Sequence, residues 1–263
     1  MKTTDLKKLV QNPQYISGIY NYCDRWCERC EFTSRCLNCT LAEKQFDNLQ
    51  EIGQCNDEFW EQFNEVFEDT LNLVREIAIE HGFDPDAISE MPDSLVQAEN
   101  NKLTHLITYT TDAYAEMVEE WFDSNEFYFD KKQEELSWLR IVTPGNNPEK
   151  EVADINDAAE VIRWYQYQID VKIRRAVSSA LDEQSECDDM PKDSDGSAKV
   201  ALIGIERSIT AWKKLLNLFP ELEKQIIDLI LLLKGILKRV ETQFPRARAF
   251  VRPGFDEIGV AVA

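Results

Sequence analysis

Apolar residues recur every three or four positions along most of the chain, which is the period of an amphipathic α-helix. This pattern predicts helices over residues 56–81, 94–124, 131–140, 154–181, 199–217 and 220–243. Gly82 provides a stop after the first of them, and Pro220 stands in the first turn of the last. Strand and helix patterns do not alternate, which disfavours a parallel-sheet enzyme. We therefore expect an all-α fold, a helical bundle of five or more helices with a small N-terminal Cys-rich metal-binding module.

The same pattern divides the chain into three parts. Residues 1–55 form a Cys-rich metal-binding segment packed on the bundle, residues 56–243 form the helical bundle, and residues 244–263 form an irregular C-terminal tail. Within the bundle, residues 182–198 hold seven acidic residues and one lysine, which is typical of a flexible acidic loop. We expect the arginines of the tail, Arg246, Arg248 and Arg252, to pair with acidic helix faces.

Five of the seven cysteines lie close together near the N-terminus. They are Cys23, Cys27, Cys30, Cys36 and Cys39, in the spacing Cx3Cx2Cx5Cx2C, which contains two CxxC pairs. A CxxC turn brings two thiolates close enough to share one metal ion or cluster. Four ligands complete a tetrahedral site, so one cysteine is spare. We predict Cys23, Cys27, Cys30 and Cys36 as the metal ligands, with Cys39 as the alternate to Cys23.

The surroundings of these cysteines favour a bound metal over disulfides. The N-terminus lacks the apolar stretch and cleavage site of a signal peptide, so we expect a cytoplasmic protein with reduced thiols. Residues 1–45 carry seven Lys or Arg and five Asp or Glu, a net charge of +2, in a chain whose net charge is -20. Three of these positive charges, Arg25, Arg29 and Arg35, are interleaved with the cysteines and would offset the charge of a thiolate site.

The spacing favours zinc as the cofactor, in a structural site that holds the N-terminal segment on the bundle. An iron–sulfur cluster is the alternative, because cysteine thiolates also hold such clusters. Reduced cysteines without metal and a redox role also stay open. Cys55 and Cys187 stand apart from the cluster, and we interpret both as incidental thiols.

Charge and hydropathy restrict the partners of the chain. A net charge of -20 disfavours nucleic acid, because such a surface repels phosphates. The most apolar stretch, residues 226–233, is too short for a membrane span of about 20 residues. The acidic helix faces would suit a basic protein partner. The helix over 221–242 is apolar nearly all round, which indicates either the centre of the bundle or a homodimer interface.

The bundle offers one further candidate for chemistry, a polar pocket between the helices at 154–181 and 199–217. Its candidate residues are Glu160, Arg163, Tyr167, Glu206 and Arg207. A buried charge must be paired, so these residues form either an interhelical ion-pair network or a binding pocket. A di-metal carboxylate site would usually add a Glu-x-x-His pair, and neither His81 nor His105 follows a glutamate at that spacing.

These observations predict a cytoplasmic, metal-binding helical protein in which zinc is structural and which acts through protein–protein interaction. The alternative is a helical-bundle oxidoreductase that uses an iron–sulfur cluster or an internal carboxylate metal site. The sequence identifies no catalytic residue, so whether the protein is an enzyme stays open.

Overall fold

The computed structural model describes residues 12–42, 72, 75, 79, 102–142, 148–182 and 192–257. The chain divides into two units, Met1–Gln97 with Arg252–Ala263 and Ala98–Val251. The first unit therefore joins segments from opposite ends of the sequence. The predicted helix at 56–81 lies outside the described residues, apart from positions 72, 75 and 79, which are helical.

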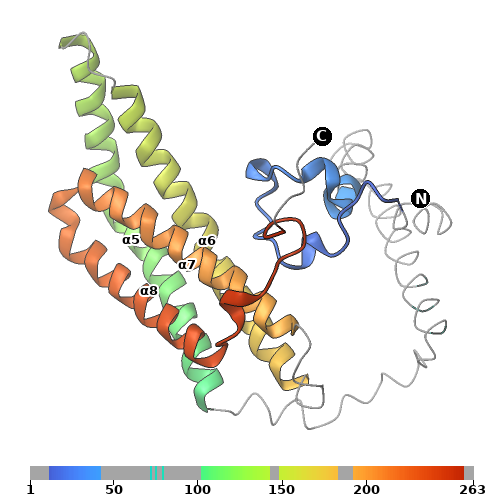
Figure 1. The fold of residues 1–263 in the computed structure, drawn as a ribbon. Helices are drawn as coiled ribbons and strands as arrows, with labels where there is room; N and C mark the ends of the chain where they lie inside the picture. Colours follow the sequence, from blue (N-terminus) through green and yellow to red (C-terminus); the bar gives the residue numbers. More distant parts are fainter. Residues whose placement is uncertain are drawn as a thin grey trace, which may run out of the picture. The chain divides into compact units, whose positions relative to one another are not determined.

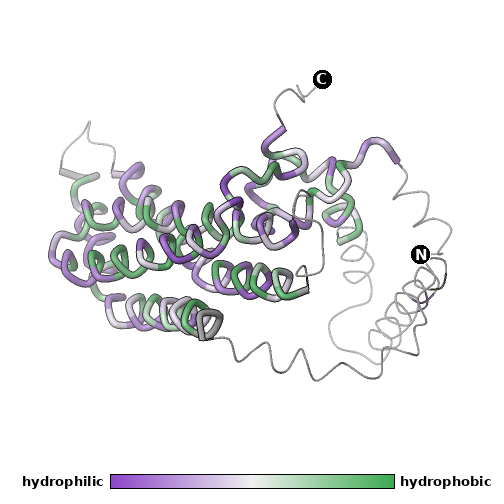
Figure 2. Tube along the Cα trace, turned by 60° about the horizontal axis from the view of Figure 1, so that its bottom comes forward, coloured by the Kyte–Doolittle hydropathy of each residue, from purple (hydrophilic) through white to green (hydrophobic). Residues whose placement is uncertain are grey.

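The described residues of the second unit form four long α-helices (Figure 1). They are α5 (Lys102–Val142), α6 (Pro148–Asp182), α7 (Asp193–Leu218) and α8 (Glu223–Gln243), with the short 3-10 helices η6 (Pro220–Leu222) and η7 (Ala247–Ala249). The described residues contain no strand. Hydrophobic and hydrophilic residues alternate along each helix (Figure 2), as the amphipathic pattern predicts. The prediction of a mostly helical protein is confirmed.

Polar pairs between the helices define their directions. Lys214 of α7 pairs with Asp157 of α6, and Asp193 of α7 pairs with Arg175 of α6. The end of α7 therefore lies beside the start of α6, so the two helices are antiparallel. The same reasoning from Asn125–Gln225 and Arg239–Thr110 makes α5 and α8 antiparallel. Contacts also join α5 to α6 and α7 to α8. The four helices therefore close into an up-down-up-down bundle.

Aromatic residues from three segments fill the centre of this bundle. Trp212 of α7 is fully buried, and its indole N–H donates a hydrogen bond to the Tyr114 hydroxyl of α5 over 3.1 Å. Its ring packs edge-to-face on Trp121, with 4.8 Å between the ring centroids. Phe129 of α5 packs against Phe219, which follows α7. Burial raises the pKa of Tyr114, whose hydroxyl therefore stays neutral in the core.

Helices α6 and α7 approach closely at Gly204. A methyl group at this position would lie 2.8 Å from Cδ1 of Tyr165 and 3.3 Å from Cγ1 of Ile169, which is too close for a side chain. The Tyr165 ring is buried in the space that glycine leaves, and Arg207 donates a hydrogen bond to its hydroxyl. The sequence Leu-Ile-Gly-Ile in α7 thus sets the distance between the two helices.

Helix α5 corrects the prediction of two separate helices over 94–124 and 131–140. It runs without a break from Lys102 to Val142. The intervening residues 125–130 contain neither glycine nor proline, so nothing in the backbone interrupts the helix. Asn125 is held inside the bundle because its side-chain amide donates to the Trp121 carbonyl and to Gln225. The expected start at Ser94 lies outside the described residues.

Two other helices begin six residues earlier than their patterns predict. Helix α6 begins at Pro148 instead of Asp154, since proline suits a first turn and Glu149 and Glu151 favour the positive end of the helix dipole. Helix α7 begins at Asp193 instead of Lys199, so residues 193–198 are helical. Small side chains at 194–198 let this acidic first turn be buried. The rest of the predicted acidic loop, 183–191, lies outside the described residues.

Helix α8 has one buried face, formed by Ile226, Leu229, Ile230, Leu233, Ile236 and Val240. Leu231, on another face, is 57% exposed. Helix α8 is therefore one of the four described helices around the core, and not a central helix that the others surround. Among the helices that the structure describes, none combines the length and the apolarity of a membrane span.

Candidate metal centre

The five clustered cysteines lie on a series of short turns in the first unit. The 3-10 helices are η1 (Ile19–Asn21), η2 (Cys27–Arg29) and η3 (Thr33–Arg35), and residues 37–42 are helical. In η2 the Cys30 amide donates to the Cys27 carbonyl over 3.1 Å, which closes the first CxxC turn. The second CxxC pair, Cys36 and Cys39, spans the start of the helical segment. Each CxxC pair therefore folds back on itself as the spacing predicts.

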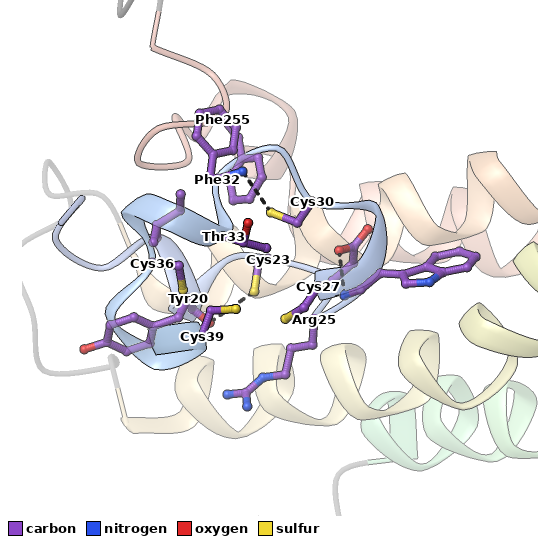
Figure 3. A pocket seen from close by; sticks show the side chains of 13 residues that line it. Tyr20, Cys23, Arg25, Cys27, Cys30, Phe32, Thr33, Cys36, Cys39 and Phe255 are labelled. Atoms are coloured by element: carbon purple, nitrogen blue, oxygen red, sulfur yellow. Dashed lines mark hydrogen bonds between the residues drawn. The ribbon is translucent and has the colours of Figure 1, made fainter. Parts of the chain in front are cut away.

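All five clustered cysteines line one pocket, together with Ile19, Tyr20, Asp24, Arg25, Trp26, Phe32, Thr33 and Phe255. Figure 3 shows the sulfur atoms of Cys23, Cys27, Cys36 and Cys39 in the middle of this pocket. Cys39 is buried, Cys27 is exposed and the other three are half-buried, so the pocket opens to solvent on the Cys27 side. The five residues are thiols that form no disulfide with one another.

Cys27 interacts with all four of the other clustered cysteines. Burial raises the pKa of its thiol, negative charge on Cys23 and Cys36 raises the pKa further, and a hydrogen bond with Cys39 opposes these effects. The Cys23 thiol donates a hydrogen bond to the Tyr20 carbonyl over 3.5 Å. Thiols that raise one another's pKa are hard to ionise together, and a bound divalent cation would stabilise their anions.

Cys30 has a different environment. Its sulfur accepts a hydrogen bond from the Phe32 amide over 3.4 Å and faces that amide in Figure 3. Burial raises the pKa of the Cys30 thiol, and the hydrogen bond from Phe32 lowers it. The groups that act on Cys30 include Cys23 and Cys27 among the thiols.

The thiols do not stand at metal-binding positions around a common centre. Within the part of the chain that the structure describes, no group of three or more His, Cys, Asp or Glu side chains is arranged to hold a metal ion. A metal would therefore require the cysteine side chains to turn towards one point in the pocket they share. Cysteine has a single side-chain rotation to the sulfur, so this adjustment is small compared with a backbone change.

The backbone between Cys23 and Cys27 forms a tight turn. The Asp24 carboxylate accepts a hydrogen bond from the Trp26 amide over 3.2 Å, and Arg25 adopts a left-handed conformation with φ of 58°. Trp26 is buried, and the Arg29 guanidinium stacks 4.1 Å from the centre of its ring. This turn places Cys23 and Cys27 on the same pocket.

The C-terminal segment completes the pocket, which sequence reasoning missed. Phe255 lines the pocket and packs edge-to-face on Phe32, with 5.1 Å between the ring centroids. Arg252 stacks over the Phe255 ring and forms an ion pair of 3.0 Å with Asp256. The dipeptide Pro253-Gly254 was the available signal, since it marks a turn between an arginine and an aromatic residue. Of the arginines expected to pair with helix faces, Arg248 does so, with Glu206 and Glu241.

Gly254 is required at this turn for two reasons. Its φ is 76°, and a Cβ atom would lie 3.0 Å from the Cδ1 atoms of both Ile16 and Ile19. We expect Gly254→Ala to destabilise the first unit by about 1–3 kcal/mol, because it adds left-handed strain and a close contact. Hydrogen exchange of residues 12–42, followed by mass spectrometry, measures this effect.

Gly235→Ala is the matched control for this substitution. Gly235 lies in α8, and a methyl group added there would have no atom within 4 Å, so alanine should stabilise the bundle by about 0.5–1 kcal/mol through helix propensity. Equal exchange rates in Gly254→Ala and the native protein would contradict the role assigned to Gly254.

The five residues of the expected polar pocket are all exposed and have different partners. The Tyr167 hydroxyl donates to Glu119 over 2.9 Å, Arg163 stacks on Phe122, and Glu206 pairs with Arg248. Glu160 is exposed on α6, and Arg207 donates to Tyr165. The structure therefore does not bring Glu160 and Glu206 together in a buried network. Cys55, Cys187 and His81 lie outside the described residues.

The chain was compared with protein-family models, with curated proteins and with solved structures, and none of these comparisons found a match.

Proposed function

We propose that the pocket lined by the five cysteines binds one zinc ion, and that this zinc is structural. The observation that supports the proposal is the convergence of five thiols, from a stretch of 17 residues (23 to 39), on one pocket. Zinc is held in structural sites by four thiolates in a closed tetrahedron. A site with four cysteine ligands leaves no open position for a substrate, so it stabilises the fold and does not catalyse a reaction.

The contacts favour Cys23, Cys27, Cys36 and Cys39 as the four ligands. Cys27 interacts with each of the other three and with Cys30, but the Cys30 sulfur already accepts a hydrogen bond from the Phe32 amide. This set replaces Cys30, which the spacing alone favours, by Cys39. It also uses one complete CxxC pair and one Cx3C pair, so both turns contribute two ligands.

The cysteine-rich segment, residues 12–42, has few buried apolar side chains. Of the described residues of its unit, only Ile19, Trp26 and Cys39 are buried apolar side chains. These three side chains supply little hydrophobic stabilisation to the segment, and small modules of this kind usually depend on disulfides or metals. Structural zinc supplies about 10–16 kcal/mol of apparent binding free energy in small modules, which is far more than three buried side chains provide.

The proposed role of the whole protein is interaction with another protein in a reducing compartment such as the cytoplasm. The zinc module would hold the two ends of its unit together, and the exposed surface of the helical bundle would bind the partner. The net charge of -20 favours a basic partner over a nucleic acid.

Elemental analysis of the full chain, purified without oxygen or chelators, tests the zinc proposal. We expect one zinc per chain and no absorption in the visible region. Iron with sulfide and a brown colour would contradict zinc and support an iron–sulfur cluster in the same pocket. Protein that contains no metal and takes up no added zinc would contradict both.

A further inference from the structure

Helix α5 exposes three large aromatic residues. Tyr109, Phe127 and Trp138 are 73%, 69% and 69% exposed, the largest fractions among the described hydrophobic residues of the bundle. Each of these rings exposes apolar surface that a partner molecule could cover, and aromatic residues are enriched in protein interfaces. All three belong to one helix, so their spacing along the sequence shows whether they lie on the same side of it.

The three aromatic residues lie along one line of the helix. Tyr109 and Phe127 are 18 residues apart, which is about five turns, and Phe127 and Trp138 are 11 residues apart, which is about three turns. Whole numbers of turns place the three rings on the same side of α5. This side faces away from the core, because Tyr114, Trp121 and Phe122 occupy the buried side.

The residues between Tyr109 and Phe127 are rich in acidic side chains, whereas Lys131, which is exposed, lies between Phe127 and Trp138. Asp112, Glu116, Glu120 and Asp123 are exposed on the same side of α5, between Tyr109 and Phe127. From residue 109 to residue 130 the sequence has seven acidic residues (112, 116, 119, 120, 123, 126 and 130) and no Lys, Arg or His. We use the name α5 outer face for the surface formed by the three aromatic residues together with Asp112, Glu116, Glu120 and Asp123.

We propose that the α5 outer face binds an arginine- and lysine-rich segment of a partner protein. The proposal rests on the interaction role given to the bundle above and is independent of the zinc site. Guanidinium and ammonium groups stack favourably on aromatic rings and pair with carboxylates, so one cationic chain satisfies both kinds of residue on this face. Arginine and aromatic residues are also the types that contribute most to protein interfaces.

The exposed carboxylates between Tyr109 and Phe127 favour a cationic chain over other ligands. An apolar helix would bury four carboxylates without partners, which is costly. Nucleic acid and anionic lipid surfaces would be repelled by the same carboxylates. Trp138 follows Tyr109 by 29 residues, so the face is about 44 Å long and an extended segment of about 13 residues would cover it.

A fluorescein-labelled peptide of alternating arginine and serine, about 14 residues long to match the face, is the probe for this proposal. Its fluorescence anisotropy is titrated with the full native chain at about 0.15 M ionic strength, where exposed charges are partly screened. The variant Tyr109→Ser/Phe127→Ser/Trp138→Ser keeps every charge of the face and removes the rings. We expect this variant to bind at least about tenfold more weakly than the native chain.

The matched control removes three exposed apolar side chains from other surfaces of the bundle. In Val171→Ser/Leu231→Ser/Val251→Ser the replaced side chains are 56%, 57% and 59% exposed, and binding should equal that of the native chain. The double variant Glu116→Lys/Glu120→Lys should also lose binding, while Glu221→Lys/Glu223→Lys near the start of α8 should lose less. Circular dichroism confirms that each variant is folded.

Two results would overturn the proposal. The first is that the native chain does not bind the peptide. The second is equal binding by the aromatic triple variant and the native chain, which would mean that attraction to the net charge alone explains the binding. Protein freed of zinc should bind the peptide as the native chain does, because α5 belongs to the other unit. Failure of the zinc proposal is therefore seen in the metal content, and failure of this proposal in the anisotropy.

Discussion

Cys27→Ser is expected to abolish stoichiometric zinc binding. Cys27 is the thiol that interacts with Cys23, Cys36 and Cys39, so its loss leaves only three of the four proposed ligands. A serine hydroxyl remains protonated near neutral pH and is a poor zinc ligand. Because loss of a residue that only supports a ligand costs about 10–100-fold in affinity, we expect loss of a ligand to weaken binding by more than about 100-fold. Competition with a chromophoric chelator measures the affinity.

Cys30→Ser is the matched control, since Cys30 lies on the same pocket and is half-buried. If the Cys30 sulfur only accepts the Phe32 amide, this variant keeps one zinc per chain. Loss of zinc in Cys30→Ser together with retention in Cys39→Ser would return the ligand set to Cys23, Cys27, Cys30 and Cys36. Retention of zinc in Cys27→Ser would contradict the metal site altogether.

Trp212→Ala is expected to destabilise the helical bundle by about 3–5 kcal/mol, the usual cost of removing a buried tryptophan. The substitution removes the edge-to-face contact with Trp121 and leaves the Tyr114 hydroxyl without its indole donor. Domains of this kind have about 5–15 kcal/mol of stability in total, so the loss is a large fraction. Urea unfolding followed by circular dichroism measures the change in free energy of unfolding.

Trp138→Ala is the control, because it removes a tryptophan that is exposed instead of one that is packed in the core. Trp138 is 69% exposed, and its removal should change the free energy of unfolding by less than about 0.5 kcal/mol. Similar effects of the two substitutions would mean that Trp212 is not at the centre of the bundle core.

The helical class and the core of α6 could be predicted from the sequence because local periodicity determines both. Ile162, Tyr165, Ile169, Ile173, Ala176 and Val177 recur at helical spacing and are all buried. Periodicity was less informative in α5, where Leu106 and Met117 share the apolar pattern and yet are 48% and 41% exposed. Which apolar residues face the core depends on the neighbouring helices, and a single helix pattern does not contain that information.

The turn of the cysteine pairs could also be predicted, because it depends on residues three apart. The place of Phe255 could not, because it depends on a contact between residues more than 200 positions apart in the chain. The same limit applies to the expected pocket around Glu160 and Glu206, because these two residues meet only if α6 and α7 turn the right faces towards each other. Composition identified the carboxylates, but only the structure shows that both are exposed.

The joining of Phe32 and Phe255 has a consequence for the synthesis of the protein. Phe255 follows Cys39 by 216 residues, so at about 5–20 residues per second the ribosome adds it some 10–45 s after the last clustered cysteine. During that interval the thiols have emerged, but the aromatic ring that closes their pocket has not. The nascent chain therefore carries five thiols in a pocket that lacks Phe255, and the final pocket forms only after most of the chain has been translated.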